Sequence, residues 1–219
     1  LRFLAECLPG ATRRNITQLV RLGLYSRARL QALRRDTGIR YDHLEKGILH
    51  FYTHESELQS AQASARIMRE EGCDITMVDT EGAVRIEPAL RNARHLIVGG
   101  SMASGDESGD AHQFTQALAG MAAARGVSFR YGVTALRFAA AGDRVQGLVC
   151  SDDGGSAEWT CVADAYVMAA GVFSTALLRP LGVRLNVYPA KGYSATLPVA
   201  DPALAYSVSL TDDEYKLVY

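Results

Sequence analysis

The sequence predicts an α/β fold with α+β character, in which a βαβ-type half is interleaved with an antiparallel half. Three observations support this prediction. Helical patterns dominate the first part of the chain, alternating strand patterns follow residue 126, and a strand–turn–helix pattern covers 163–182. Because a simple doubly wound domain does not place so many antiparallel strands in succession, we expect two interleaved halves.

The first predicted helix covers Thr12–Arg35 and is strongly basic. Apolar side chains recur along it at helical spacing, and no acidic residue occurs between Glu6 and Asp36. One interpretation is an amphipathic helix that binds an anionic membrane surface or a partner. The simpler interpretation, which we favour, is a solvated helix whose arginines pair with acidic side chains elsewhere in the fold. Seven arginines lie on or beside the apolar stripe: Arg13, Arg14, Arg21, Arg27, Arg29, Arg34 and Arg35.

Strands and helices alternate in the next segment. The loop that closes this segment, SMASGDESGD (101–110), carries three acidic residues, but its spacing does not match an EF-hand. We therefore expect a surface loop that ends in a helix cap. The expected strands are Ile48–Thr53, Ile75–Asp79 and Leu96–Gly100, and the expected helices are His54–Glu71 and Thr80–Glu87.

A helix and a meander follow. Asp110 is expected to cap a helix over Ala111–Arg125. Alternation from Val127 onward then predicts a meander of three or four strands, with a hairpin turn at Gly142-Asp143. Further strands are expected at Val187–Leu197, at Ala205–Leu210 and from Glu214.

The segment ADAYVMAAGVFSTALLRPLG (163–182) is the most informative part of the chain. A short apolar strand, Ala165–Met168, ends in two alanines and a glycine, and a helix begins near Phe173. Small residues let the backbone approach a ligand closely, and the start of a helix directs free N–H groups at it. This arrangement suits a phosphate- or flavin-bearing cofactor. A tight turn packed against a neighbouring element explains the same residues equally well.

Composition excludes several classes of protein. The formal net charge of −1 argues against general nucleic-acid binding, and no apolar run has the length of a membrane-spanning helix. The four cysteines form no CxxC pair and the five histidines no HExxH motif, so we expect reduced thiols in the cytoplasm and no metal. Neither GxGxxG nor GxSxG occurs in the sequence.

Several segments carry a resemblance to a known family. They resemble the small subunit of FAD-dependent D-amino acid dehydrogenases, within the glycine oxidase/D-amino acid oxidase family. The resemblance covers the middle portion of such an enzyme, without the upstream dinucleotide fingerprint or the downstream segment that supplies the arginine for the substrate carboxylate. The segments are RLGLYSRARLQALRRDTGI (21–39), GDESGDAHQFTQALAGMAAARGVSFRYG (105–132), ADAYVMAAGVFSTALLRPLG (163–182), VYPAKGYSATLP (187–198) and DDEYK (212–216).

This resemblance implies a domain arrangement. An FAD-binding Rossmann-like half, incomplete in this chain, would be interleaved with an antiparallel-sheet substrate domain. Residues 1–104 would supply helix-rich and substrate-domain segments, residues 105–182 the FAD-binding portion with its β-meander, and residues 183–219 further strands of the substrate domain.

The resemblance also implies site residues. It places a backbone contact to the adenine end of FAD at Ala135, and a second contact to the flavin nucleotide at the 169–171 turn, which is Ala169, Ala170 and Gly171. Tyr193, in the KGY run that leads into the substrate domain, and Tyr215 are the implied substrate-binding side chains. Ordinary strand aromatics remain an alternative for both tyrosines.

The implied reaction is oxidative deamination of D-amino acids to 2-oxo acids and ammonia, with electrons passed to a quinone or another respiratory acceptor. No catalytic proton carrier is assigned, because none is required if the amine arrives neutral.

The expected location is the cytoplasm, with the basic helix as a peripheral contact to the inner face of the cell membrane. The alternatives are a related amine oxidase (glycine or sarcosine oxidase, or hydroxyproline dehydrogenase), a catalytically incompetent fragment that lacks the phosphate loop, and a membrane-surface adaptor.

Overall fold

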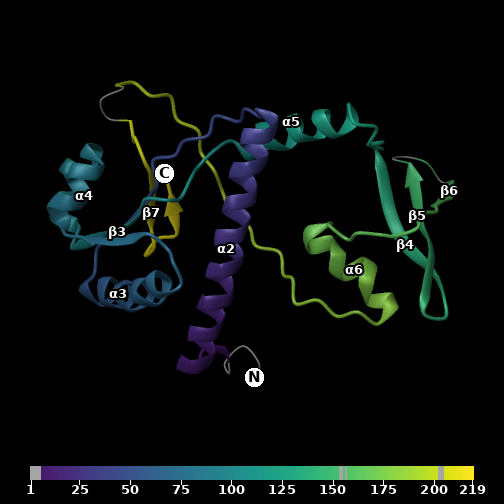
Figure 1. Cartoon of the computed structure of the whole chain (residues 1–219), viewed down its shortest axis with the longest axis horizontal. Coiled ribbons are helices and arrows are strands. Elements are labelled where there is room, and N and C mark those ends of the chain that lie inside the picture. Colours follow the sequence, from purple (N-terminus) through teal and green to yellow (C-terminus); the bar gives the residue numbers. More distant parts are fainter. Residues whose placement is uncertain (1–5, 153–154, 156, 202–204) are drawn as a thin grey trace. The chain divides into compact units, whose positions relative to one another are not determined.

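A computed structural model describes residues 6–152, 155, 157–201 and 205–219 of the chain. The chain divides into two compact units, which are described one at a time (Figure 1). Unit 1 comprises Leu1–Arg125 and Pro198–Tyr219, and unit 2 comprises Gly126–Leu197. The expected α/β fold with α+β character is confirmed: the helices accompany a mixed sheet in unit 1 and a separate antiparallel sheet in unit 2.

Unit 1 begins with the long basic helix α2, Pro9–Thr37. A proline at the first helical position fits because its missing N–H would have had no partner there. The helix ends at Gly38, which has a left-handed φ of 66° and donates its N–H to the Arg34 carbonyl. The sequence therefore predicted this helix correctly and underestimated its length by a few residues at each end.

The sheet of unit 1 joins segments from both ends of the chain. Its order is β2-β3-β1-β7-β8, and every neighbouring pair is antiparallel except β1 with β7. His50 of β1 is paired with Ser101 on one side and with Thr211 on the other. The strands are β1 (Ile48–Tyr52), β2 (Ile75–Val78), β3 (Gly99–Ala103), β7 (Ser209–Asp212) and β8 (Leu217–Val218).

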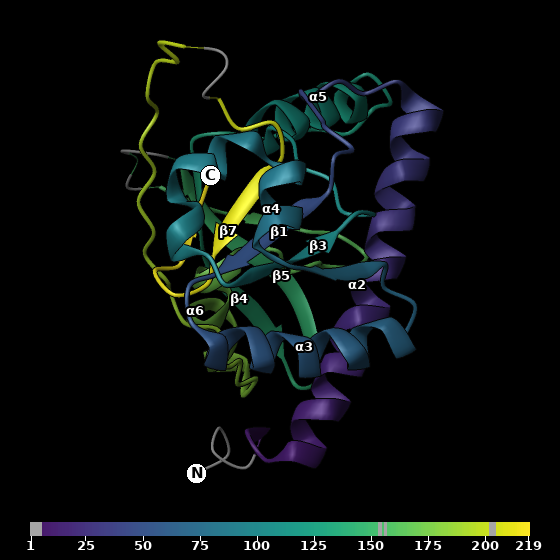
Figure 2. The ribbon, with the colours of Figure 1, turned by 90° about the vertical axis from the view of Figure 1, so that its left-hand side faces the viewer.

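One face of this sheet carries the core of unit 1. Leu49 of β1 and Leu210 of β7 are almost fully buried and pack with α4 (Thr80–Ile86) and the 3-10 helix η1 (Pro88–Leu96). Successive side chains of a strand point to opposite faces, so His50 and Tyr52 lie on the other face. Helix α3 (Glu55–Glu70) contacts the sheet on that other side, and Figure 2 shows α3 and α4 on opposite sides of the strands.

The last helix of unit 1 is α5, Ala111–Ala123. The predicted cap is confirmed, because the Asp110 carboxylate accepts the Gln113 N–H at 2.9 Å. In contrast, β3 lies later than expected and includes Ser101–Ala103, which the sequence had assigned to the acidic loop. Gly99 and Gly100 begin it, because close neighbours leave no room for a side chain there: a Cβ on Gly100 would lie 2.7 Å from the His50 carbonyl.

Unit 2 contains the predicted meander, whose strands β4, β5 and β6 pair antiparallel in sequence order. Gly142, with a φ of 61°, lies in the expected hairpin turn. The elements of unit 2 are β4 (Val133–Ala141), β5 (Arg144–Asp152), β6 (Glu158–Cys161), the 3-10 helix η2 (Gly171–Phe173), α6 (Ser174–Leu178) and the 3-10 helix η3 (Arg179–Leu181).

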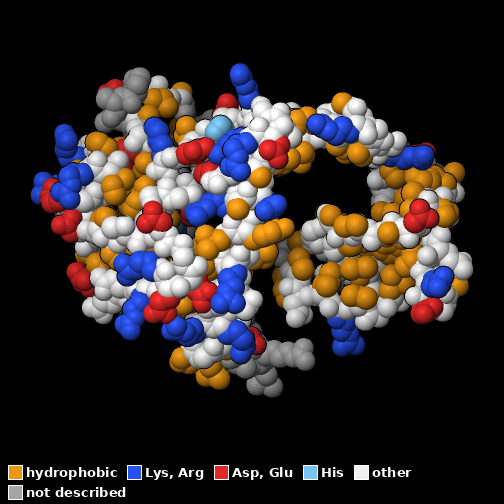
Figure 3. Space-filling model, in the orientation of Figure 1, with side chains coloured by type: hydrophobic (Ala, Val, Ile, Leu, Met, Phe, Trp, Pro, Cys, Tyr) orange, Lys and Arg blue, Asp and Glu red, His pale blue; other side chains and the backbone are white. Residues whose placement is uncertain are grey.

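Three expected strands are absent from the described structure. Residues 127–131, 165–168 and 187–197 have no regular secondary structure. A strand needs a partner for its backbone groups, and none of the described strands pairs with these segments. Their apolar side chains lie exposed instead: Val167 is 92% exposed and Tyr188 80%. Figure 3 shows many hydrophobic side chains at the surface of unit 2.

Candidate functional site

The predicted cofactor turn lies in unit 2 and is open. Ala169 and Gly171 are exposed, and Ala170 is half-buried. Gly171 has a φ of 54°, a conformation that side-chain-bearing residues rarely adopt, and a Cβ built there would meet no atom within 4 Å. No bulky side chain therefore fills this turn, so the backbone is accessible to a ligand.

Ala135 belongs to the same unit as this turn. It lies on β4 opposite Cys150, beside a break in strand register. Helix α6, which follows the turn, contacts β4. On the segment before the turn, the Tyr166 ring packs edge-on against Phe138 of β4, with 5.8 Å between ring centroids. Contacts on both sides of the turn thus connect it to the strand of Ala135.

The two predicted substrate tyrosines belong to different units. Tyr193 of unit 2 is 89% exposed, and the Lys191 ammonium lies 5.3 Å from its ring centroid. Tyr215 of unit 1 is 67% exposed and lies in the turn between β7 and β8. Its backbone N–H donates to the Asp212 carboxylate at 3.2 Å, which fixes this turn. The structure leaves a substrate role for either tyrosine untested.

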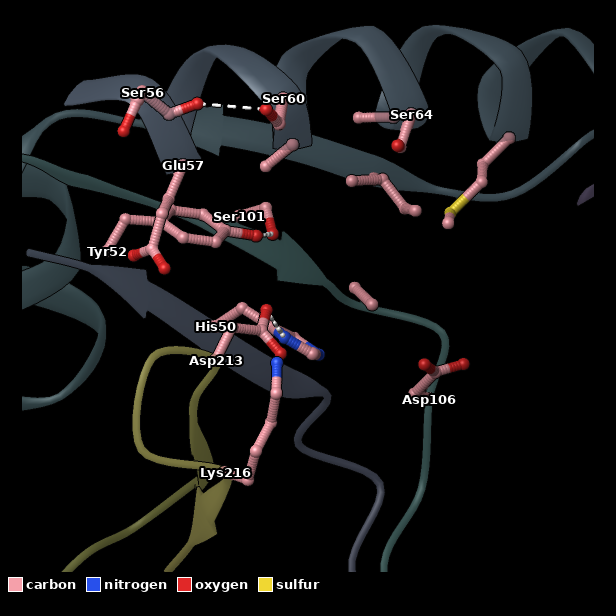
Figure 4. A pocket seen from close by; sticks show the side chains of 15 residues that line it. His50, Tyr52, Ser56, Glu57, Ser60, Ser64, Ser101, Asp106, Asp213 and Lys216 are labelled. Carbon is pink, nitrogen blue, oxygen red and sulfur yellow. Dashed lines mark hydrogen bonds and ion pairs between the residues drawn. The ribbon is translucent and has the colours of Figure 1, made fainter. Parts of the chain in front are cut away.

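Unit 1 contains a pocket that the sequence did not predict. It has a volume of about 630 Å³ and lies between α3 and the sheet face opposite the core (Figure 4). Helix α3 lines it with a polar row, Ser56, Ser60 and Ser64, and with the small side chains of Ala61 and Ala65. The remaining lining comes from Glu57, Met68, His50, Tyr52, Ile75, Ser101, Ala103, Asp106, Asp213 and Lys216.

Two hydrogen-bonded pairs form the sheet side of this pocket. His50 Nδ1 lies 3.0 Å from a carboxylate oxygen of Asp213, and the Tyr52 hydroxyl lies 3.0 Å from the Ser101 hydroxyl. Burial raises the pKa of the Tyr52 phenol, the bond with Ser101 opposes this shift, and the nearby Asp213 and Glu57 carboxylates add to it. The phenol therefore remains protonated at neutral pH, and either hydroxyl of the pair can donate the hydrogen bond.

Glu57 is the unusual group in this pocket. One of its carboxylate oxygens is buried and has no hydrogen-bond partner among the described residues. Figure 4 shows its carboxylate directed from α3 toward the sheet side, where Lys216 extends toward His50 and Asp213. Lys216 has a φ of 56°, so its backbone is held in a conformation that is uncommon for lysine. The turn DDEYK therefore directs two charged side chains into the pocket.

Sequence reasoning missed this pocket although signals for it exist. The alternation HFY in β1 places His50 and Tyr52 on one face. The spacing of Glu57, Ala61 and Ala65 places these residues on one face of α3. Only the fold shows that these faces meet the DDEYK turn, since His50 and Asp213 are 163 residues apart in the sequence.

The arginines of α2 largely pair within unit 1. This observation supports the simpler interpretation of the basic helix, because paired arginines leave less free positive charge for a lipid surface. Arg29 stacks instead, with its guanidinium 5.4 Å from the ring centroid of Tyr25. Among the described residues, five of the seven arginines form ion pairs: Arg13 with Glu70, Arg14 with Glu6, Arg21 with Glu71, Arg27 with Asp106, and Arg34 with both Glu45 and Glu107.

Within residues 6–152, 155, 157–201 and 205–219, no group of three or more histidine, cysteine or acidic side chains is arranged to hold a metal ion. Over the same described part of the chain, no helix combines the length and apolar character needed to cross a bilayer.

Comparison with known proteins identifies the class. Residues 5–219 match the family described as FAD dependent oxidoreductase (DAO). The D-amino acid dehydrogenase of Dechloromonas aromatica is 57% identical over 220 residues, which are 100% of this chain and 52% of that protein. The D-amino acid dehydrogenase of Paramagnetospirillum magneticum is 46% identical over 219 residues, or 100% of this chain and 50% of that protein.

Solved structures agree with this class. The glycine oxidase of Geobacillus kaustophilus superposes with a TM-score of 0.73 at 28% identity, over 89% of this chain and 50% of that one. The L-proline dehydrogenase of P. horikoshii has a TM-score of 0.66 at 14% identity, over 93% of this chain and 49% of that one, which supports the fold alone.

The chain belongs to the DAO family of FAD-dependent oxidoreductases. It spans about half the length of the curated relatives it matches. Membership implies FAD as the cofactor, and the open turn at Gly171 fits a dinucleotide, because small side chains and a positive φ let the backbone approach it.

Proposed function

We propose that the protein carrying this chain catalyses the FAD-dependent oxidative deamination of D-amino acids to 2-oxo acids and ammonia. The observation that carries this proposal is 57% identity to a D-amino acid dehydrogenase over the full length of the chain. FAD, when bound, supplies the acceptor for the hydride that leaves the substrate α-carbon. The resulting imino acid hydrolyses in water, so this chain needs no residue for that second step.

The roles proposed for this chain are binding and orientation. The backbone at Ala135 and at Ala169–Gly171 would contact the nucleotide part of FAD, and the open, small-residue turn supports this assignment. Tyr193 and Tyr215 are proposed substrate contacts. Each side chain is exposed within its own unit and is therefore accessible to a small ligand.

The electron acceptor and the location belong to the same proposal. A dehydrogenase passes its electrons to an acceptor other than oxygen, and we propose a quinone or another respiratory acceptor. A cytoplasmic enzyme at the inner face of the cell membrane would meet that acceptor. The proposed contact is the start of α2, where Arg13, Arg14 and Arg21 stay more than 60% exposed although each forms an ion pair. Failure of the enzyme to sediment with anionic vesicles at low salt would exclude this location.

A related amine oxidase is the second candidate. The observation in its favour is the superposition on glycine oxidase, which has a TM-score of 0.73 at 28% identity. The two candidates differ in substrate and in electron acceptor, so one set of assays separates them.

The experiment uses the FAD-loaded enzyme with D-alanine, L-alanine, glycine, sarcosine and hydroxyproline, each with an artificial dye and with oxygen. We expect turnover of D-alanine with the dye, little turnover with oxygen, and none of L-alanine. Faster oxidation of glycine with oxygen would assign the protein to the second candidate. No turnover of any of these amines by a fully flavinated preparation would refute both.

A variant of the cofactor turn tests the binding residues in the same preparation. Ala169→Glu places a carboxylate where an anionic dinucleotide is expected, so the FAD content measured at the flavin absorbance band should fall. Ala140→Glu, at an exposed position near the far end of β4, is the matched control and should retain FAD. Equal FAD content in the two variants would remove Ala169 from the site.

A further inference from the structure

The pocket of unit 1 combines an apolar wall with charged groups. Ala61, Ala65 and Met68 lie one turn apart along α3, and Ala103 faces them from β3. Glu57 precedes Ala61 by one turn on the same face of the helix. A ligand lying along α3 would therefore contact alkyl groups over part of its length and a carboxylate at one end.

Among the described residues, Glu57 is the one carboxylate lining this pocket that forms no ion pair. Asp213 is paired with His50 at 3.0 Å, and Asp106 with Arg27 at 3.2 Å. One oxygen of Glu57, in contrast, is buried without a hydrogen-bond partner among the described residues. An unpartnered buried acceptor costs free energy, and a positively charged donor relieves this cost more effectively than a neutral one.

We infer that this pocket receives the side chain of the amino-acid substrate and prefers a side chain with an alkyl stem and a cationic head, as in lysine or arginine. The head would donate to Glu57, and the stem would lie against Ala61 and Ala65. Lys216 enters the pocket from the β7–β8 turn and repels a second cation, so it restricts where the head can lie. The volume of about 630 Å³ is within the range of sites for small ligands.

This inference rests on the proposed function, because it assigns the pocket to the substrate of that reaction. Its test compares D-lysine with D-norleucine, whose side chain has the same stem without the ammonium group. Both kcat/KM values are measured on the FAD-loaded enzyme and on Glu57→Gln, which keeps the shape and removes the charge. We expect Glu57→Gln to lower the D-lysine to D-norleucine ratio by about tenfold or more, the range for a charged hydrogen bond.

The matched control is Glu55→Gln. Glu55 also lies in the first turn of α3, but it is exposed and does not line the pocket. It should leave the substrate ratio as in the wild type, which separates the pocket from a general effect of charge at the start of the helix. An unchanged ratio in Glu57→Gln, or equal losses in both variants, would overturn the inference.

A binding measurement separates this inference from the proposed function. Cadaverine has two ammonium groups on an alkyl stem and no carboxylate, so its binding does not require turnover. We expect it to raise the melting temperature of the wild type and of Glu55→Gln, and to have a clearly smaller effect on Glu57→Gln. Glu57-dependent binding of cadaverine without oxidation of any D-amino acid would refute the proposed function and the assignment of the pocket to its substrate, and would leave the pocket as a cation-binding site. Oxidation of D-alanine without a Glu57-dependent effect would refute the inference alone.

Discussion

Glu87 is a buried carboxylate that holds two distant segments together. It is 1% exposed and lies at the junction of α4 and η1. One oxygen accepts the Ala89 N–H at 3.0 Å, and the other accepts the Ser207 N–H, the Ser207 hydroxyl and the Val208 N–H at 2.5, 2.9 and 3.1 Å. These bonds fix the segment that leads into β7. Burial raises the pKa of Glu87, but the hydrogen bonds outweigh burial, so the pKa is lower than usual.

The substitution Glu87→Gln should lower the free energy of unfolding by about 1–3 kcal/mol, because an amide nitrogen cannot accept the bonds that a carboxylate oxygen accepts. Since the folded-state pKa is lowered, the charge stabilises the fold fully above the ordinary glutamate pKa of about 4.3 and progressively less as the pH falls through the lower folded value. Urea unfolding of wild type and variant at neutral and acidic pH measures both effects.

Exposed Glu55→Gln serves as the control and should change stability by about 0.5 kcal/mol or less. A difference between wild type and Glu87→Gln that stays constant from neutral pH down to acid unfolding would show that the charge of Glu87 does not contribute.

The sequence could predict only part of the residue-scale picture. The small residues at 169–171 and the cap at Asp110 are local patterns, so they were recognised from the sequence. Glu57, His50 and Asp213 were not, because their importance comes from contacts between elements far apart in the chain. Acidic residues in the first turn of a helix, such as Glu55 and Glu57 of α3, are expected for helix stability, which conceals any other role of Glu57.

The end of helix α2 contains the most buried ion pair of unit 1 among the described residues. The Arg34 side chain is 13% exposed and that of Glu107 is 9%, with a guanidinium nitrogen 2.5 Å from a carboxylate oxygen. Arg34 also donates to the Tyr41 hydroxyl at 3.1 Å and pairs with Glu45. The Glu107 hydrogen bond, and then the Tyr41 one, raise the pKa of Arg34, while Arg34 lowers the pKa of Glu107.

Removing Arg34 should be far more damaging than removing an exposed arginine of the same helix. Arg34→Ala leaves the Glu107 carboxylate buried without a cation, with the Gln31 amide as its remaining side-chain donor, so we expect a loss of about 3–5 kcal/mol in the free energy of unfolding. Arg13→Ala breaks the pair with Glu70, whose partners are 61% and 46% exposed, and should cost about 1 kcal/mol or less. Chemical denaturation of the two variants compares them, and equal losses would contradict a special role for the buried pair.

At the scale of elements, the sequence predicted helices well and isolated strands poorly. The apolar periodicity of α2 and α3 and the Asp110 cap of α5 are local, and so is the hairpin signal between β4 and β5. The segments 165–168 and 187–197 have the composition of strands, but among the described strands none pairs with them. A segment with the composition of a strand does not become one unless its backbone N–H and C=O groups find hydrogen-bond partners.

The whole molecule consists of two units with separate internal contacts, and unit 2 is inserted in the sequence between the two segments of unit 1. The helices α2 to α5 all belong to unit 1, whereas Trp159, the single tryptophan of the chain, lies on β6 of unit 2. Far-ultraviolet circular dichroism therefore reports mainly on unit 1, and tryptophan fluorescence on unit 2.

We expect these two signals to give different unfolding midpoints, because chains with more than one unit commonly deviate from a single two-state transition. The substitution Glu87→Gln should shift the circular dichroism transition to lower denaturant and leave the fluorescence transition in place. Coincident midpoints that shift together in the variant would show that the two units unfold as one.

The parallel pairing of β1 with β7 has a consequence for synthesis on the ribosome. β1 is translated before unit 2 and its neighbour β7 only after the whole of it; His50 of β1 and Asp213, the residue after β7, are 163 residues apart. At roughly 5–20 residues per second, one edge of β1 waits for roughly 10–30 s before its partner is made. A nascent chain with an open strand edge is a substrate for holding chaperones and a nucleus for aggregation. The yield of this protein in cells should therefore depend on whether a chaperone covers the open edge of β1 until β7 has been made.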